Sequence, residues 1–175
     1  MLRKFIILMV LILLILMTPG CKQQEVTYDL EKFKHINAYV LEIVPAIEEV
    51  QFDFEIWQAD MTDPEKKEWL LLDADRIERI NRLFLTEDFP PYEEVKTWVV
   101  PVAAGEQEWI IKGNKLAPAL EKMEKSSNDI VTLIKSIGQS DDQIYLTSKR
   151  DELSAALKEA GEATAQLANL FIRES

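Results

Sequence analysis

The sequence predicts an all-α protein, an antiparallel bundle of about four long amphipathic helices. Two observations lead to this fold class. Beyond residue 29, apolar residues recur every seven positions in paired series, which is the spacing of one buried stripe along a helix. The link around Gly138, between the last two of these segments, is only a few residues long, and such a short link places consecutive helices side by side and antiparallel.

The first helix is expected from Asp29 onward. Its stripe consists of two seven-residue series, Phe33, Val40, Ile47 and Phe54, and Ile36, Ile43, Val50 and Trp57. The alternation between Val50 and Ile56 would also suit a strand, but the seven-residue series runs through it and favours one long helix. Pro45 is expected to kink this helix.

The second helix is expected to begin at residues 62–65 and to stop before Phe89-Pro90-Pro91. Thr62 or Asp63 can cap its start, and Pro64 suits the first turn. Its buried rows are Leu70, Ile77 and Phe84, with Asp73 and Ile80 beside them.

Residues 90–113 form a less regular insertion. Two β-rich runs, 95–102 and 109–111, flank Ala103-Ala104-Gly105, so a hairpin and a short helix are both possible structures here. Pro101 disfavours a central strand.

The third helix is expected from about Asn114 to Gly138, and the fourth from Ser140 or Asp141 nearly to the C-terminus.

Residues 1–21 have the pattern of an export signal. Arg3 and Lys4 precede an apolar run of 13 residues, 5–17, which ends shortly before Gly20 and the lone Cys21. A helix of that length spans roughly 20 Å, less than the ~30 Å of a bilayer core, so we interpret it as a cleaved segment. An ordinary secretory signal or a short uncleaved anchor, with Cys21 as an incidental thiol, is the alternative.

The Gly20-Cys21 pair after this run resembles the lipobox of bacterial lipoproteins. Thr18 and Pro19 depart from the pattern, which usually has Leu and a small residue at these positions. The resemblance implies cleavage before Cys21, so that residues 1–20 are a signal peptide, 21–28 a lipidated Cys with a short tether, and 29–175 the helical domain. It also implies an extracytoplasmic protein whose Cys21 lipid anchors it to the cell membrane, or to an outer membrane if the organism has one.

The composition argues against several functions. The net charge is −11, and it becomes −13 once residues 1–20 are removed, because Arg3 and Lys4 leave with them; such acidity disfavours nucleic acid as a partner. A single Cys excludes an internal disulfide. His35, the only His, is not preceded by Glu at the spacing of di-iron bundles and is expected at the solvent surface.

No cofactor or metal is expected, since nucleotide and haem motifs are lacking. A weak calcium site remains a minor hypothesis, and a solvated face explains the same acids more simply. The acidic groups in question are Glu48-Glu49 with Asp53 and Glu55, Asp60 with Asp63, Glu93-Glu94 and Asp141-Asp142.

Polar residues occupy several positions of the predicted buried stripes. Asp73 and Arg150 are expected to face each other as a core ion pair; the alternative is that Arg150 binds an anionic ligand in a polar core pocket together with Ser127 and Thr164. Trp98 and Trp109 lie in the insertion and either fill the core or form an exposed patch for a partner.

We therefore expect a lipid-anchored envelope protein that binds another protein, as an interaction or scaffold module, and that is not an enzyme. One alternative is a bundle that binds or senses a small ligand through a polar core pocket. A second is a hydrolase built on a pair of carboxylates with perturbed pKa values in a cleft.

Substituting Cys21→Ser tests the anchor. Without the thiol no lipid can be attached, so labelling by radioactive palmitate should be abolished and the protein should leave the membrane fraction. Unchanged labelling would contradict the lipoprotein interpretation.

Overall fold

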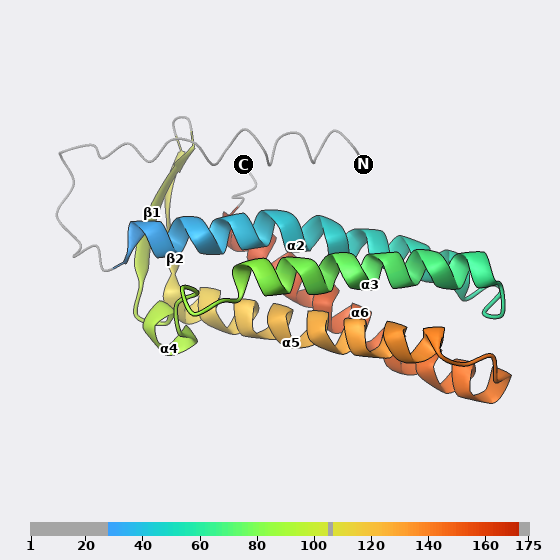
Figure 1. Ribbon diagram of the computed structural model, residues 1–175. Helices are drawn as coiled ribbons and strands as arrows, with labels where there is room; N and C mark the ends of the chain where they lie inside the picture. The colour runs from blue at the N-terminus through green and yellow to red at the C-terminus, as the bar shows by residue number, and fades with distance from the viewer. Residues whose placement is uncertain (1–27, 105–106, 172–175) are drawn as a thin grey trace, which may run out of the picture.

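A computed structural model describes residues 28–104 and 107–171 (Figure 1). The predicted signal peptide, the Gly20-Cys21 cleavage site and most of the tether lie outside these residues. The prediction of a mainly helical protein with four long helices is confirmed, and the insertion contains one further helical turn and a β-hairpin. The elements are α2 (Leu30–Trp57), α3 (Pro64–Phe84), α4 (Tyr92–Val95), β1 (Val99–Ala104), β2 (Gln107–Lys112), α5 (Gly113–Gly138) and α6 (Gln143–Phe171).

The four long helices lie side by side, and the chain reverses direction from each one to the next (Figure 1). α2 packs on α3, α3 on α5, and α5 on α6, whereas α2 and α6 share a much narrower contact. The hairpin, the start of α2 and the end of α6 lie together at one end, called here the hairpin end (Figure 1). The α2–α3 and α5–α6 links lie at the opposite, far end.

α2 is a single helix, as the seven-residue series predicted, and both of its series are buried. Asp29 caps it by accepting hydrogen bonds from the backbone N–H groups of Glu31 (2.9 Å) and Lys32 (3.1 Å). Pro45 lies inside the helix without ending it. The strand alternative for residues 50–56 is therefore wrong, because burial follows the helical period through this segment.

α3 begins as predicted, with Pro64 in its first turn and Asp63 as its cap. The Asp63 side chain accepts from Glu65 N at 2.9 Å. α6 begins slightly later than predicted, because Asp142 rather than Ser140 or Asp141 caps it. The Asp142 carboxylate accepts from Tyr145 N (2.8 Å), and its carbonyl oxygen accepts from Leu146 N (2.9 Å).

At the far end, a buried lysine joins α3 to the link between α5 and α6. Lys67 on α3 is buried, and its ammonium donates to the carbonyl oxygen of Ser140 (2.8 Å) and pairs with the Asp141 carboxylate. At the hairpin end, Phe33 stacks on Phe171 with ring centroids 6.0 Å apart. Each end of the helices is therefore tied by contacts between segments far apart in the sequence.

In the insertion, both structures that the sequence left open occur together: one turn of helix, α4, and the antiparallel hairpin of β1 and β2. Val100 pairs with Ile111, and both side chains are buried toward the helices. Trp98 and Gly113 continue this register, since Gly113 N donates to Trp98 O at 2.8 Å. Gly113 thus ends the hairpin and begins α5.

Gly113 marks the closest backbone approach around the insertion. A Cβ atom added there would lie 1.8 Å from the carbonyl oxygen of Val95 and 2.8 Å from Trp98 N. Backbone atoms cannot move aside as a side chain can. The hairpin, α4 and α5 therefore meet where only a glycine fits.

Gly113→Ala should lower the free energy of unfolding by roughly 2–4 kcal/mol, because the methyl group overpacks the junction. Gly161→Ala is the matched control, since its added Cβ would meet only the flexible Gln51 side chain, at 3.1 Å. That substitution should leave stability unchanged or raise it, as alanine favours a helix interior. Urea unfolding of both variants measures the difference, and equal losses would contradict this reading of Gly113.

Candidate functional site

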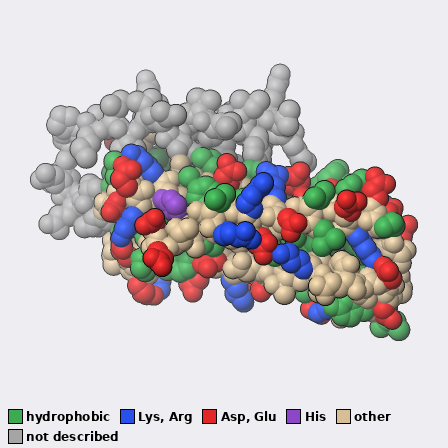
Figure 2. All heavy atoms as spheres, viewed as in Figure 1, with side chains coloured by type: hydrophobic (Ala, Val, Ile, Leu, Met, Phe, Trp, Pro, Cys, Tyr) green, Lys and Arg blue, Asp and Glu red, His purple; other side chains and the backbone are tan. Residues whose placement is uncertain are grey.

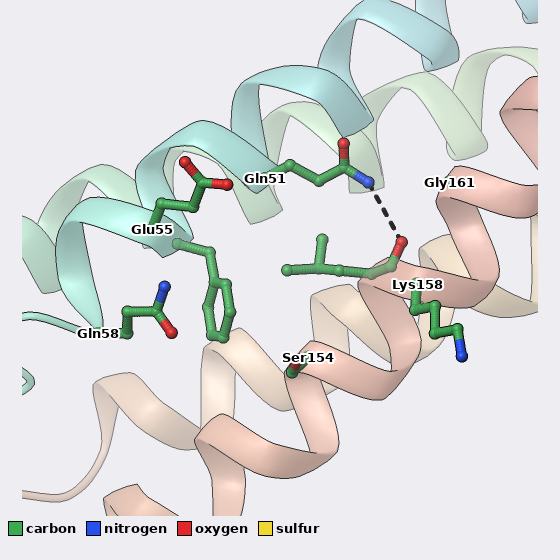
Figure 3. Close-up of a pocket in the computed structure, with 8 residues that line it drawn as sticks. Gln51, Glu55, Gln58, Ser154, Lys158 and Gly161 are labelled. Atoms are coloured by element: carbon green, nitrogen blue, oxygen red, sulfur yellow. Dashed lines mark hydrogen bonds between the residues drawn. The ribbon is translucent and has the colours of Figure 1, made fainter.

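A groove lies between the second half of α2 and the middle of α6 (Figure 3). Its volume is about 330 Å³. Each helix contributes four residues, at positions i, i+3, i+4 and i+7, which lie on one face of a helix. They are Gln51, Phe54, Glu55 and the capping residue Gln58 from α2, and Ser154, Leu157, Lys158 and Gly161 from α6.

One hydrogen bond joins the two helices at this groove, where Gln51 Nε2 donates to the carbonyl oxygen of Leu157 at 3.2 Å (Figure 3). Phe54 and Leu157 are buried and give the groove apolar walls. Ser154 and Gly161 have small side chains, which leaves the space open on the α6 side. One acid, Glu55, and one base, Lys158, line the same groove. This mixture suits the binding of an amphipathic surface.

None of the residues of the predicted polar core pocket, Arg150, Ser127 and Thr164, lines the groove. Ser127 is fully buried and accepts a hydrogen bond from Asn81 Nδ2 (2.9 Å). The hydroxyl oxygen of Thr164 is buried without a hydrogen-bond partner. Ser127 lies on α5, whereas Arg150 and Thr164 lie on α6.

The predicted Asp73–Arg150 ion pair is not formed. Arg150 binds its neighbour Asp151 through Nε (2.9 Å) and Nη2 (2.7 Å). Asp73 faces α2 instead, because α3 packs between α2 and α5 while α6 packs on α5. The seven-residue pattern identifies buried positions on each helix, but it does not say which helix lies opposite.

Asp73 meets an acidic neighbourhood on α2. Its side chain is 8% exposed, and its Oδ2 atom has no donor group beside it. Burial, together with the nearby charges of Asp53 and Glu49, raises the pKa of Asp73 to about 7, against the opposing effect of Arg76. Burial also raises the pKa of Asp53. Arg76 itself forms an ion pair with Glu49. Asp53 and Asp73 can therefore share one proton across the α2–α3 seam.

A second polar cluster in the core was not predicted from the sequence. Asn81 donates to Ser127 Oγ and to Asn128 Oδ1 (3.0 Å), and it accepts from the Tyr39 hydroxyl group (3.3 Å). Burial raises the pKa of Tyr39 above its usual range, which keeps it a donor. The signal was available, because Asn81 follows Ile77 by one helical turn on the buried face of α3.

The two tryptophans of the insertion pack in the core, which is one of the two predictions made for them from the sequence. Trp98 is 4% exposed, and Trp109 packs on the core while its Nε1 donates to the carbonyl oxygen of Leu170 (2.9 Å). An exposed patch made of these two residues is therefore wrong. The exposed apolar residue of β2 is Ile110, since alternate side chains of a strand point to opposite faces.

His35 is not a fully solvated surface residue as predicted. It is half-buried, its Nε2 donates to the carbonyl oxygen of Phe84 (2.8 Å), and its ring lies against Phe84 and Phe89. The carbonyl group of Phe84 belongs to the last turn of α3, where it has no partner within the helix. His35 therefore closes the end of α3 from the neighbouring helix α2.

The acidic pairs considered for calcium do not gather into a site. In the part of the chain that the structure describes, no three His, Cys, Asp or Glu side chains are arranged to hold a metal ion. Acidic and basic side chains are interspersed over the face seen in Figure 2. Within residues 28–104 and 107–171, no helix has the length and apolar composition needed to cross a bilayer.

Comparisons with known proteins give no match: no family model, no curated protein and no solved structure is similar to this chain. The site must therefore be interpreted from its own geometry.

The acid pair predicts an unusual pH dependence of stability. The pKa of Asp73 is about 7 in the folded chain and about 3.9 in an unfolded one, so the folded chain binds more protons between these values. Stability should therefore fall as the pH rises from about 4 to about 7. Asp73→Asn, which resembles the protonated acid, should raise the free energy of unfolding by roughly 1–2 kcal/mol at pH 8 and change it little at pH 4.

Urea unfolding of the parent and of D73N between pH 4 and pH 8 measures this effect. Asp75→Asn is the control, because Asp75 is exposed two residues further along α3. If D73N and D75N change the pH profile equally, the shared-proton interpretation of Asp53 and Asp73 is wrong.

Proposed function

We propose that this protein is a lipid-anchored, extracytoplasmic interaction module of the cell envelope, and that the α2–α6 groove receives a helix of a partner protein. The observation that supports this function is the groove itself, which two helices line with matching one-face spacing. We also infer that the four long helices form an antiparallel up-and-down bundle, in which α2–α6 is the incompletely closed seam.

The groove fits a helix better than a small molecule. Its lining residues span two turns on each helix, so its length matches two turns of a third helix laid between them. Phe54 and Leu157 offer apolar walls, and the small side chains of Ser154 and Gly161 allow a close approach. Ridges of a partner helix can then pack between the rows of α2 and α6.

Charge on the groove gives the partner an orientation. Glu55 lines it from α2 and Lys158 from α6. Neither forms an ion pair within the described chain. A partner helix that carries a basic residue on the α2 side and an acidic residue on the α6 side would satisfy both.

The anchor would set the position of the groove relative to the membrane. Residues 22–28 reach at most roughly 25 Å from Cys21 to the start of α2. The groove begins at Gln51, 21 residues beyond Leu30, which is roughly 30 Å further along the helix. The proposed docking site therefore lies on the part of α2 that is remote from the anchor, where another envelope protein can reach it.

The carboxylate-based hydrolase is the weaker candidate. Asp53 and Asp73 do converge with raised pKa values, as such an enzyme needs. The pair lies on the α2–α3 seam outside the groove, however, and Asp73 is buried, so a substrate has no space beside it. The small-ligand alternative draws no support from the groove, because Arg150, Ser127 and Thr164 do not line it.

A photo-crosslinking side chain placed at Ser154 should trap a partner protein of defined mass in intact cells. The same group at Ala155 should not, since Ala155 is exposed on the same helix but is not part of the groove lining. Gly161→Leu fills the groove and should remove the Ser154 adduct, while favouring the helix.

Equal adducts from Ser154 and Ala155, or an adduct that persists with Gly161→Leu, would contradict docking in this groove.

A further inference from the structure

The outer edge of β2 is a row of unpaired backbone groups. Gly113 N donates to Trp98 O, so this pair faces inward. Hydrogen-bonded and non-bonded pairs alternate along an antiparallel ladder. The neighbouring register pairs Val99–Lys112, Pro101–Ile110 and Ala103–Glu108 therefore direct their backbone N–H and C=O groups away from the hairpin.

The two edges of the hairpin are not equivalent. On β1 the central outward position is Pro101, which has no N–H to donate, so this edge is blunted. On β2 the outward positions are Glu108, Ile110 and Lys112, and each has both an N–H and a C=O group. Within the described residues, the backbone groups of Glu108 and Ile110 bond to no other element. Lys112 is the N-cap residue of α5, so its carbonyl oxygen accepts the first hydrogen bond of that helix and its N–H group remains outward. The Glu108 and Lys112 side chains form no ion pair with the described residues. Ile110 is 44% exposed.

The sequence of this edge is complementary to itself. If two copies of β2 lie antiparallel about an axis through Ile110, each Glu108 faces the Lys112 of the other copy, and the two Ile110 side chains meet at the centre. A register centred on Glu108 or on Lys112 would instead place like charges opposite each other. Only the register centred on Ile110 pairs all three outward positions without a like-charge contact.

We propose that the protein forms a symmetric homodimer through the β2 edge, which joins two hairpins into a four-stranded antiparallel sheet. Glu108 and Ile110 each contribute one donor and one acceptor, and Lys112 contributes its N–H group, so all three residues form backbone hydrogen bonds across the two-fold axis. Two-stranded sheets are marginal alone, and pairing two of them gives each hairpin a second neighbour. The hairpin end is remote from the α2–α6 groove, so both surfaces can be occupied at once.

Disulfide trapping tests the predicted symmetry. In the dimer the two Ile110 Cα atoms lie about 5.5 Å apart, within disulfide range, so the full-length Ile110→Cys variant should form a cross-linked dimer under mild oxidation. Ala103→Cys is the control, because β1 lies at the outer edge of the four-stranded sheet, roughly 14 Å from its counterpart. We expect roughly tenfold more dimer from I110C than from A103C. The parent chain measures any linkage through Cys21.

A charge exchange tests the register independently. On the I110C background, Glu108→Lys or Lys112→Glu alone places like charges opposite each other twice per dimer, and each should lower the cross-linking yield roughly three- to tenfold. The double variant restores both opposite-charge pairs and should recover the yield. Circular dichroism confirms that the variants remain helical.

Equal yields from I110C and A103C would overturn the β2 edge as the dimer interface. Loss of yield in the double charge variant as large as in the single variants would overturn the proposed register.

Discussion

The rest of the structure depends on the burial of α5. This helix packs against α3 on one flank and α6 on the other, and its first turns contact α4 and β2. Its fully buried side chains include Leu116, Leu120, Met123, Ile130 and Ile134. α2 packs mainly on α3, and α6 packs mainly on α5, so α2 and α6 contact each other only narrowly. That incomplete contact opens the groove between α2 and α6.

The start of α5 also determines the position of the hairpin. Gly113 is at once the last residue of the ladder and the first of the helix, and it lies against the backbone of Val95. The ladder register set at this point directs Ile110 outward and Ile111 inward. Pro101 is tolerated in β1 for the same reason, since its missing N–H falls on the outer edge. One close backbone contact thus selects which strand edge is available for pairing.

The core contains polar groups of two kinds. The amide of Asn81 satisfies Ser127 and Tyr39 on two neighbouring helices, so this cluster adds specific hydrogen bonds between α2, α3 and α5. Asp73, one seam away, has no such donor and depends on a proton shared with Asp53. The first arrangement stabilises the packing at any ordinary pH, while the second makes it depend on pH. Neither is part of the groove or the β2 edge.

The sequence by itself determined the helices. The seven-residue series and the capping residues predicted α2, α3, α5 and α6 to within a few residues, because periodicity and capping are local properties of the chain. Only the tertiary structure decided which helices adjoin, and so placed Asp73 opposite Asp53 rather than opposite Arg150. It also put Trp98 in the core and Ile110 on the surface. The physical reason is that a stripe of apolar residues specifies burial but not its partner, which follows from how all the stripes pack together.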